Sequence, residues 1–316
     1  MHVVGASMGS LVAKRALTML ENEIPNHCVR SYTSFDGPLL GANIPLGLQV
    51  ALNYYAPISG KIRDLKERML DRPAAKQMLL LHYQNQDQAH EYRSKFMRDS
   101  SLQAFPLLPW KFAITNGSNQ MTFQYADNLQ KLTEGDSLMH FNIAQPLFDN
   151  VKAYAKLIGG KTLYTVVSVL PESDAKLYLY AHGISGNTNG KGTVGTFKTT
   201  YKKEFNHWVE PYASSYDHVA GGMSDVTATF HNALRKQSWL IFSEKYTSNT
   251  CFIPTWSALS SDSAKIKYTR PLKQTIGNQF LLLRNTPFDN YYSQTENQDH
   301  VFFEYEKGGN ADWLIG

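Results

Sequence analysis

Cysteine, long apolar runs and concentrated charge are all scarce in this sequence. The chain has 2 cysteines, Cys28 and Cys251, in 316 residues. This number identifies no redox compartment; we expect two ordinary buried thiols, and whether they pair is open. No apolar run approaches the about 18–20 residues that a membrane-spanning helix needs. The 31 lysines and arginines are scattered and the net charge is +4, which excludes the basic stripe typical of nucleic-acid binding.

The sequence also lacks the patterns of a metal or cofactor protein. None of the 10 histidines is paired with another at the helix or turn spacing that predicts a zinc site. No segment repeats at a fixed period. We therefore expect no metal and no cofactor.

Both ends of the chain look cut. Residues 1–4 are apolar and lead directly into a glycine-rich turn, with no signal peptide before them. Residues 312–316 stop inside a segment whose pattern predicts a helix. We expect the chain to be the C-terminal part of a longer protein.

What is present is enough for a globular core. Hydrophobic residues make up 42% of the chain and aromatic residues 12%, and the length allows one large domain or two ordinary ones. The opening pattern predicts a strand at 1–4, a helix at 10–20 and a second strand at 29–35. Strand, helix and strand in this order are the unit of a parallel sheet, so the expected fold class is α/β.

The rest of the chain changes pattern twice. Residues 43–100 are mostly helical, with helices expected at 74–81 and 90–97, and a further strand is expected at 111–115. Period-two alternation predicts antiparallel strands at 162–169 and 176–181, and residues 183–195 are rich in turn-forming types. From 239 to 300 the pattern returns to that of the core.

The most specific motif is Gly-x-Ser-x-Gly, from Gly5 to Gly9, placed between a strand and a helix. This spacing predicts a strained strand-to-helix turn that holds the hydroxyl of Ser7 clear of the sheet. We expect both glycines to be small because backbone and helix pack closely there, and the N–H of Met8 to serve as an oxyanion donor. The alternative is a chance glycine turn with a helix-capping serine.

These residues carry a resemblance to a known family. The run from 3 to 17, the turn at 34–45, the segment 252–259 and a late Pro-Phe-Asp with Asn-x-x-His (287–289 and 297–300) resemble secreted bacterial lipases and esterases of the GPI-inositol-deacylase-like branch of the α/β-hydrolases. The resemblance implies an N-terminally truncated hydrolase core with a helical lid and an antiparallel β insertion. Its implied parts are 1–42 (nucleophile elbow and next strand), 43–110 (lid), 111–158 (core strand and helix), 159–215 (β insertion) and 216–316 (C-terminal core).

The catalytic base should come late, because this fold orders its triad as serine, acid, histidine. His300 fits best: it follows a polar loop, precedes an apolar segment, and stands where the resemblance places the base. A surface histidine is the alternative. His218 is the rival, and His182 and His207 fall within the predicted insertion.

The acid is the least certain member of the triad. The turns at 116–118 and 249–254, where a carboxylate would be usual, have none. Asp36 ends the strand after the elbow helix, from where it would reach His300 and fix its tautomer. Asp289 and Asp217 are alternatives, and Asp36 would otherwise be a turn carboxylate that caps the following loop.

The function implied is a secreted or cell-surface serine carboxylester hydrolase that forms an acyl-enzyme on Ser7 with a small-molecule or lipid ester. An acyltransferase, or a non-catalytic surface-binding protein on a hydrolase scaffold, remains an alternative. If the strands before the elbow are missing, the sheet exposes an edge and one oxyanion donor is lost. We therefore expect weak activity or none.

Overall fold

The structure is a computed structural model of the whole chain. It describes the following residues: 1–25, 27–57, 60–85, 89–118, 137–145, 173–180, 192–199, 204–209, 216, 219–235, 240–246, 250–261, 286–294, 296–303, 305 and 309–315.

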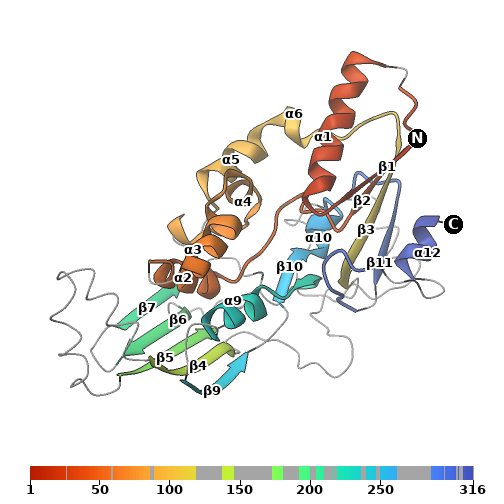
Figure 1. Cartoon of the computed structure of the whole chain (residues 1–316). Coiled ribbons are helices and arrows are strands. Elements are labelled where there is room, and N and C mark those ends of the chain that lie inside the picture. The colour runs from red at the N-terminus through yellow and green to blue at the C-terminus, as the bar shows by residue number, and fades with distance from the viewer. Residues whose placement is uncertain are drawn as a thin grey trace.

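A four-stranded parallel sheet holds the two ends of the chain together (Figure 1). Its strands are β1 (His2–Ala6), β2 (Ser31–Phe35), β3 (Trp110–Ser118) and β11 (Asn290–Gln294), in the order β1-β2-β3-β11. Each neighbouring pair is parallel. The expected α/β class is therefore confirmed. Among the described strands β1 pairs only with β2 and β11 only with β3, so these two are the edge strands of this sheet.

Helix α1 (Met8–Glu23) connects β1 to β2, as the opening pattern predicts. Its apolar side packs on the sheet: Leu17 is buried beside Tyr32, with Leu11 and Leu20 against the same cluster. The helix stops at Ile24, which has an extended backbone and precedes Pro25. The 3.6-residue spacing of the apolar side chains therefore accounts for both the helix and the face that it buries.

The opposite face of the sheet is covered by α12 (Asn310–Ile315). The ring of Trp313 lies 6.0 Å from that of Phe112 and 6.0 Å from that of Tyr292. Phe112 alternates along β3 with Ala113, which packs in the α1 cluster, and successive side chains of a strand point to opposite faces. α1 and α12 thus cover different faces.

Between β2 and β3 the chain is mostly helical, as expected. The elements are α2 (Leu46–Tyr55), α3 (Gly60–Lys66), the π-helical turn η1 (Glu67–Asp71), α4 (Pro73–Met78), the 3-10 turn η2 (Tyr83–Asn85), α5 (Glu91–Arg98) and α6 (Ser100–Gln103). The prediction of a helix to residue 81 is wrong at its end. Leu79 is extended and bridges Ala42, with the N–H of Leu80 donating to the Ala42 carbonyl at 2.9 Å.

The helical segment packs against a second, small sheet. This sheet pairs β8 (Gly221–Ser224) antiparallel with β10 (Thr250–Pro254), flanked by α9 (Val226–Arg235) and α10 (Thr255–Ala258). Leu48 and Leu52 of α2 are fully buried in one cluster with Phe230 and Cys251. These two leucines therefore anchor the helices to the core.

A five-stranded antiparallel sheet lies beyond these helices (Figure 1). Its order is β7 (Glu204–Val209), β6 (Gly192–Thr199), β5 (Ser173–Tyr180), β4 (Ser137–Gln145) and β9 (Leu240–Tyr246). β5 confirms the strand predicted at 176–181, whereas 162–169 lies outside the described residues. The expected turn at 183–195 is wrong from Gly192 onward, where β6 begins. With β4 and β9 the sheet also extends beyond 159–215 on both sides.

Neither cysteine forms a disulfide. Cys251 is buried, as expected, but Cys28 is exposed, because it stands in the irregular segment between α1 and β2. In the part of the chain that the structure describes, no helix combines the length and apolar character needed to cross a membrane.

One charged side chain of α1 is buried. Lys14 is 2% exposed, and its Nζ donates to the Gln103 carbonyl at 3.3 Å and lies 4.6 Å above the ring centre of Phe105. These partners carry no negative charge to offset the loss of hydration. Burial therefore lowers the pKa of Lys14 from 10.5 to about 8.

We expect Lys14→Met to stabilise the chain and to flatten its pH dependence. Below the folded pKa the native state carries the full cost of a buried charge. As pH rises from about 8 toward 10.5, the native state loses the proton that the unfolded state keeps, so wild-type stability increases. Urea unfolding at about pH 7 should show a gain of up to about 3 kcal/mol for the variant, shrinking by about pH 9.5. Lys61→Met, at an exposed position, is the control; equal effects of the two variants would contradict this account.

Candidate active site

Ser7 stands at a strained turn between β1 and α1. Its backbone has φ 51° and ψ −130°, a region that residues other than glycine rarely occupy. The turn is fixed by the Ser7 N–H, which donates to the Phe35 carbonyl of β2 at 2.9 Å. The side chain is half-buried. The geometry expected of the Gly-x-Ser-x-Gly motif is therefore present.

The two glycines of the motif differ in their surroundings. A Cβ on Gly5 would lie 2.5 Å from the Gly9 carbonyl oxygen and 2.7 Å from Cα of Ser10, so the helix start and the strand require glycine there. A Cβ on Gly9 would meet no atom within 4 Å. The expectation that both glycines serve close packing is correct for Gly5 and wrong for Gly9. Gly9 already belongs to α1.

His300 is hydrogen-bonded to both Ser7 and Asp36. Its Nε2 lies 2.8 Å from Ser7 Oγ, and its Nδ1 lies 2.6 Å from Asp36 Oδ2. Since an ionised carboxylate only accepts hydrogen bonds, these partners indicate that Nδ1 carries the proton and that Nε2 accepts from the serine hydroxyl. Three side chains far apart in sequence therefore form one continuous hydrogen-bonded chain.

The described structure brings Asp36, and not Asp289, to the histidine. Asp36 follows the end of β2 and is fully buried, and its Oδ1 accepts the N–H of Asn116 at 3.2 Å. Asp289 precedes β11, at the other end of the sheet, where its Oδ2 accepts the N–H of Lys111 at 2.7 Å. Asp217 lies outside the described residues.

The other histidines considered from the sequence are His218, His182 and His207. His218 and His182 lie outside the described residues, and His207 belongs to β7 of the antiparallel sheet. His300 reaches the site because its own N–H donates to the Met223 carbonyl of β8 at 2.7 Å. That contact holds the loop after β11 over the carboxyl ends of the parallel strands.

Two neighbours of the triad are not among the site residues predicted from the sequence. β8 and β10 shift register between Cys251 and Ile253, a bulge that re-aims the intervening residue. That residue is Phe252, whose ring lies 5.0 Å from the imidazole of His300 in an edge-on arrangement. The second neighbour is Gly222 of β8: any Cβ there would overlap Oδ2 of Asp36. Both contacts depend on strand register, which local patterns do not encode.

Met8, expected as the oxyanion donor, is the first residue of α1. The first N–H groups of a helix have no partner within it, and the helix dipole adds positive potential at this end. Met8 immediately follows Ser7, so its N–H lies beside the reactive hydroxyl. The described residues thus offer a donor for negative charge that develops near Ser7 Oγ.

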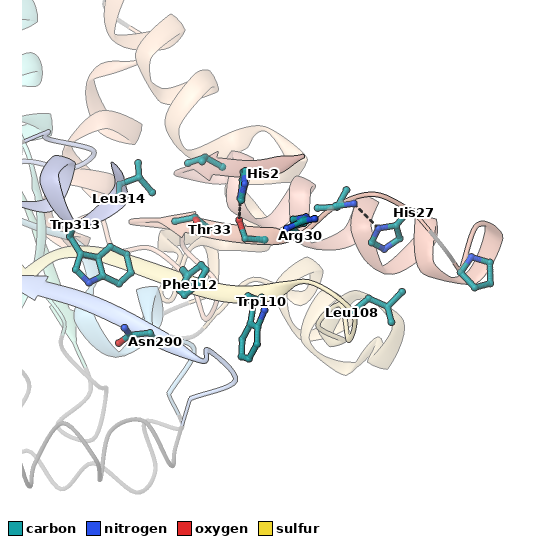
Figure 2. A pocket seen from close by; sticks show the side chains of 14 residues that line it. His2, His27, Arg30, Thr33, Leu108, Trp110, Phe112, Asn290, Trp313 and Leu314 are labelled. Atoms are coloured by element: carbon teal, nitrogen blue, oxygen red, sulfur yellow. Dashed lines mark hydrogen bonds between the residues drawn. The ribbon is translucent and has the colours of Figure 1, made fainter. Parts of the chain in front are cut away.

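An open hollow of the described structure lies away from Ser7, Asp36 and His300. It has a volume of about 1190 Å³ and is lined by residues at the start of the parallel strands, including His2, Trp110 and Asn290, as Figure 2 shows. Ser7 and Asp36 instead follow the last residues of β1 and β2. Ligands of open α/β sheets bind at the carboxyl ends of the strands, which is the end of the sheet where Ser7 and Asp36 lie and not the end that this hollow occupies.

Comparison of the chain with protein-family models, with curated proteins and with solved structures gave no match. Among the residues that the structure describes, no group of three or more His, Cys, Asp or Glu side chains is arranged to hold a metal ion.

We expect Gly222→Ala to separate Asp36 from His300. The new methyl group would overlap the carboxylate, and relief of such overpacking typically costs about 1–3 kcal/mol. Urea unfolding measures the loss, and the downfield proton resonance of His300 Nδ1–H should shift or disappear. Gly60→Ala is the matched control, since its Cβ would meet nothing within 4 Å. An unchanged resonance in Gly222→Ala would contradict the expectation.

Proposed function

We propose that the chain is a serine hydrolase of the carboxylester class, with Ser7 as nucleophile, His300 as base and Asp36 as acid. The observation that carries the proposal is the pair of hydrogen bonds made by His300, 2.8 Å to Ser7 Oγ and 2.6 Å to Asp36 Oδ2. A nucleophile bonded to a base that a third group orients is the signature of activated-serine chemistry.

The proposed reaction has two halves. Ser7 Oγ attacks the ester carbonyl carbon while His300 Nε2 takes the hydroxyl proton, and the same proton then passes to the leaving alcohol. This leaves an acyl group on Ser7. Water, deprotonated by His300, attacks the acyl-enzyme, releases the carboxylic acid and returns the proton to Ser7. Asp36 stays ionised and stabilises the imidazolium that forms in each half.

The fold supports an α/β-hydrolase interpretation. In the chain, the residues follow in the order Ser7, Asp36, His300, which is the order of that superfamily. The serine lies between a parallel strand and a helix, and the helical segment between β2 and β3 occupies the place of the proposed lid at 43–110. The lipid or short acyl ester substrate, and a secreted or cell-surface location, rest on the sequence resemblance alone.

The oxyanion donor that the elbow supplies to the proposed reaction is the backbone N–H of Met8, at the start of α1. Acylation and deacylation both pass through a tetrahedral oxyanion, and one such donor contributes on the order of 10²–10³ in rate. The same donor therefore serves both halves of the proposed reaction.

A fluorophosphonate probe tests the nucleophile. We expect the wild-type chain to be labelled once, Ser7→Ala to give no label, and His300→Ala and Asp36→Asn to be labelled at least about 10²-fold more slowly. Ser94→Ala, an exposed serine outside the site, should be labelled like the wild type. A folded wild-type chain that takes up no label would favour the alternative of a non-catalytic binding protein.

Hydrolysis of p-nitrophenyl esters tests the reaction. We expect the wild-type chain to release nitrophenol and Ser7→Ala to release it only at the uncatalysed rate, because the acyl group is transferred to Ser7. Release by Ser7→Ala at the wild-type rate would contradict the assignment of the nucleophile. Formation of methyl ester in preference to the free acid at a low methanol concentration would favour the acyltransferase alternative.

A further inference from the structure

We propose that Asn116 is a positioning residue that holds the acid and the base of the triad in register. The inference rests on the proposed function and concerns a residue that contacts no reacting atom. Asn116 is fully buried near the end of β3. β3 is the neighbour of β2, and the N–H of Asp36 donates to the Ile114 carbonyl of β3 at 2.7 Å, which brings Asn116 beside the acid.

Asn116 binds the acid through its backbone. Its N–H donates to Oδ1 of Asp36 at 3.2 Å, whereas His300 uses Oδ2. The two carboxylate oxygens are thus held by two different donors. A buried carboxylate needs such partners, because ionisation without them is costly. The carboxylate plane is therefore fixed by Asn116 on one side and His300 on the other.

Asn116 binds the base loop through its side chain. Nδ2 donates to the Asp299 carbonyl at 2.8 Å and to the Phe302 carbonyl at 2.9 Å. The carbonyl of Asn116 also accepts the N–H of Gln298 at 2.7 Å. The side-chain amide of Asn116 thus binds the backbone on both sides of His300.

The segment between these two carbonyls is a strained turn. The N–H of Phe302 donates to the Asp299 carbonyl at 3.0 Å, which closes a four-residue turn with His300 and Val301 at its centre. Val301 has φ 59°, where turns of this kind normally have glycine or asparagine. A β-branched residue persists there only when its surroundings determine the conformation. The hydrogen bonds from Asn116 to both ends of the turn supply that constraint.

The test combines three readouts on the full chain. For Asn116→Ala we expect fluorophosphonate labelling to slow by about 10–100-fold, within the range for loss of correct base geometry. KM for a p-nitrophenyl ester should change less than about threefold, since Asn116 does not face the substrate. The downfield Nδ1–H resonance of His300 should broaden or disappear. Asn116→Ser, which keeps a shorter hydroxyl donor, should recover part of the labelling rate. If the alanine variant does not fold, the serine variant replaces it in the same measurements.

Two control variants separate positioning from stability. Asn310 is also buried, and its Nδ2 donates to the same Phe302 carbonyl at 2.8 Å from α12. Asn297 is buried, and its Oδ1 accepts the N–H groups of Ser118 and Gly221 at 2.7 and 2.9 Å. We expect Asn310→Ala and Asn297→Ala to lower the urea midpoint by an amount similar to Asn116→Ala, with labelling within about threefold of wild type. Val301→Gly, which relieves the strained φ, should restore part of the labelling rate of Asn116→Ala.

The outcomes are distinguishable. A folded Asn116→Ala chain that is labelled like Asn310→Ala and keeps the His300 resonance would overturn the positioning role. A wild-type chain that is not labelled would overturn the proposed hydrolase function instead. In that case the resonance, which reports the His300–Asp36 hydrogen bond directly, still decides whether Asn116 holds the pair.

Discussion

The hydrogen bond between His300 and Asp36 is the constraint on which the site depends. It joins residues 264 positions apart in the chain, and its acceptor is fully buried. A carboxylate without water must be compensated by donors, and the imidazole N–H is one of the two that Asp36 has within the described structure. The same bond fixes the proton on Nδ1 and so leaves Nε2 as the acceptor for Ser7. One interaction therefore both compensates the buried carboxylate and prepares the proposed activation of the serine.

Backbone strain is concentrated around this bond. Among the described residues, four that are not glycine have positive φ: Ser7, Asp36, Ser260 and Val301. Two of them belong to the proposed triad, and a third directly follows its histidine. Such conformations cost free energy and persist where the surrounding structure requires them. The hydrogen bonds of the parallel sheet and those of the Asn116 side chain hold these residues in place. The rigid frame thus keeps the strained conformations populated.

The sequence predicts the parts of the site that are local. Gly5, Ser7 and the apolar spacing of α1 lie within about twenty residues, so periodicity and turn chemistry suffice for the elbow. The position of His300 follows from chain order. The choice of Asp36 over Asp289 needs the strand directions, which put the two carboxylates at opposite ends of the sheet. The contacts of Asn116 and Gly222 with Asp36 join residues 80 or more positions apart, and no local pattern carries that information.

Parallel strands explain why so distant residues meet. Their carboxyl ends lie at one edge of the sheet, so a residue placed after each strand faces those placed after its neighbours. Ser7 follows β1, Asp36 follows β2, and Asn116 lies near the carboxyl end of β3. This is the order in which the three strands stand side by side. The turn after β11 brings His300 to the same end of the sheet, beside Ser7 and Asp36. The order of these residues along the row thus repeats the spatial order of the strands, which makes the register of β2 against β3 as important for the proposed chemistry as the identity of the proposed catalytic side chains.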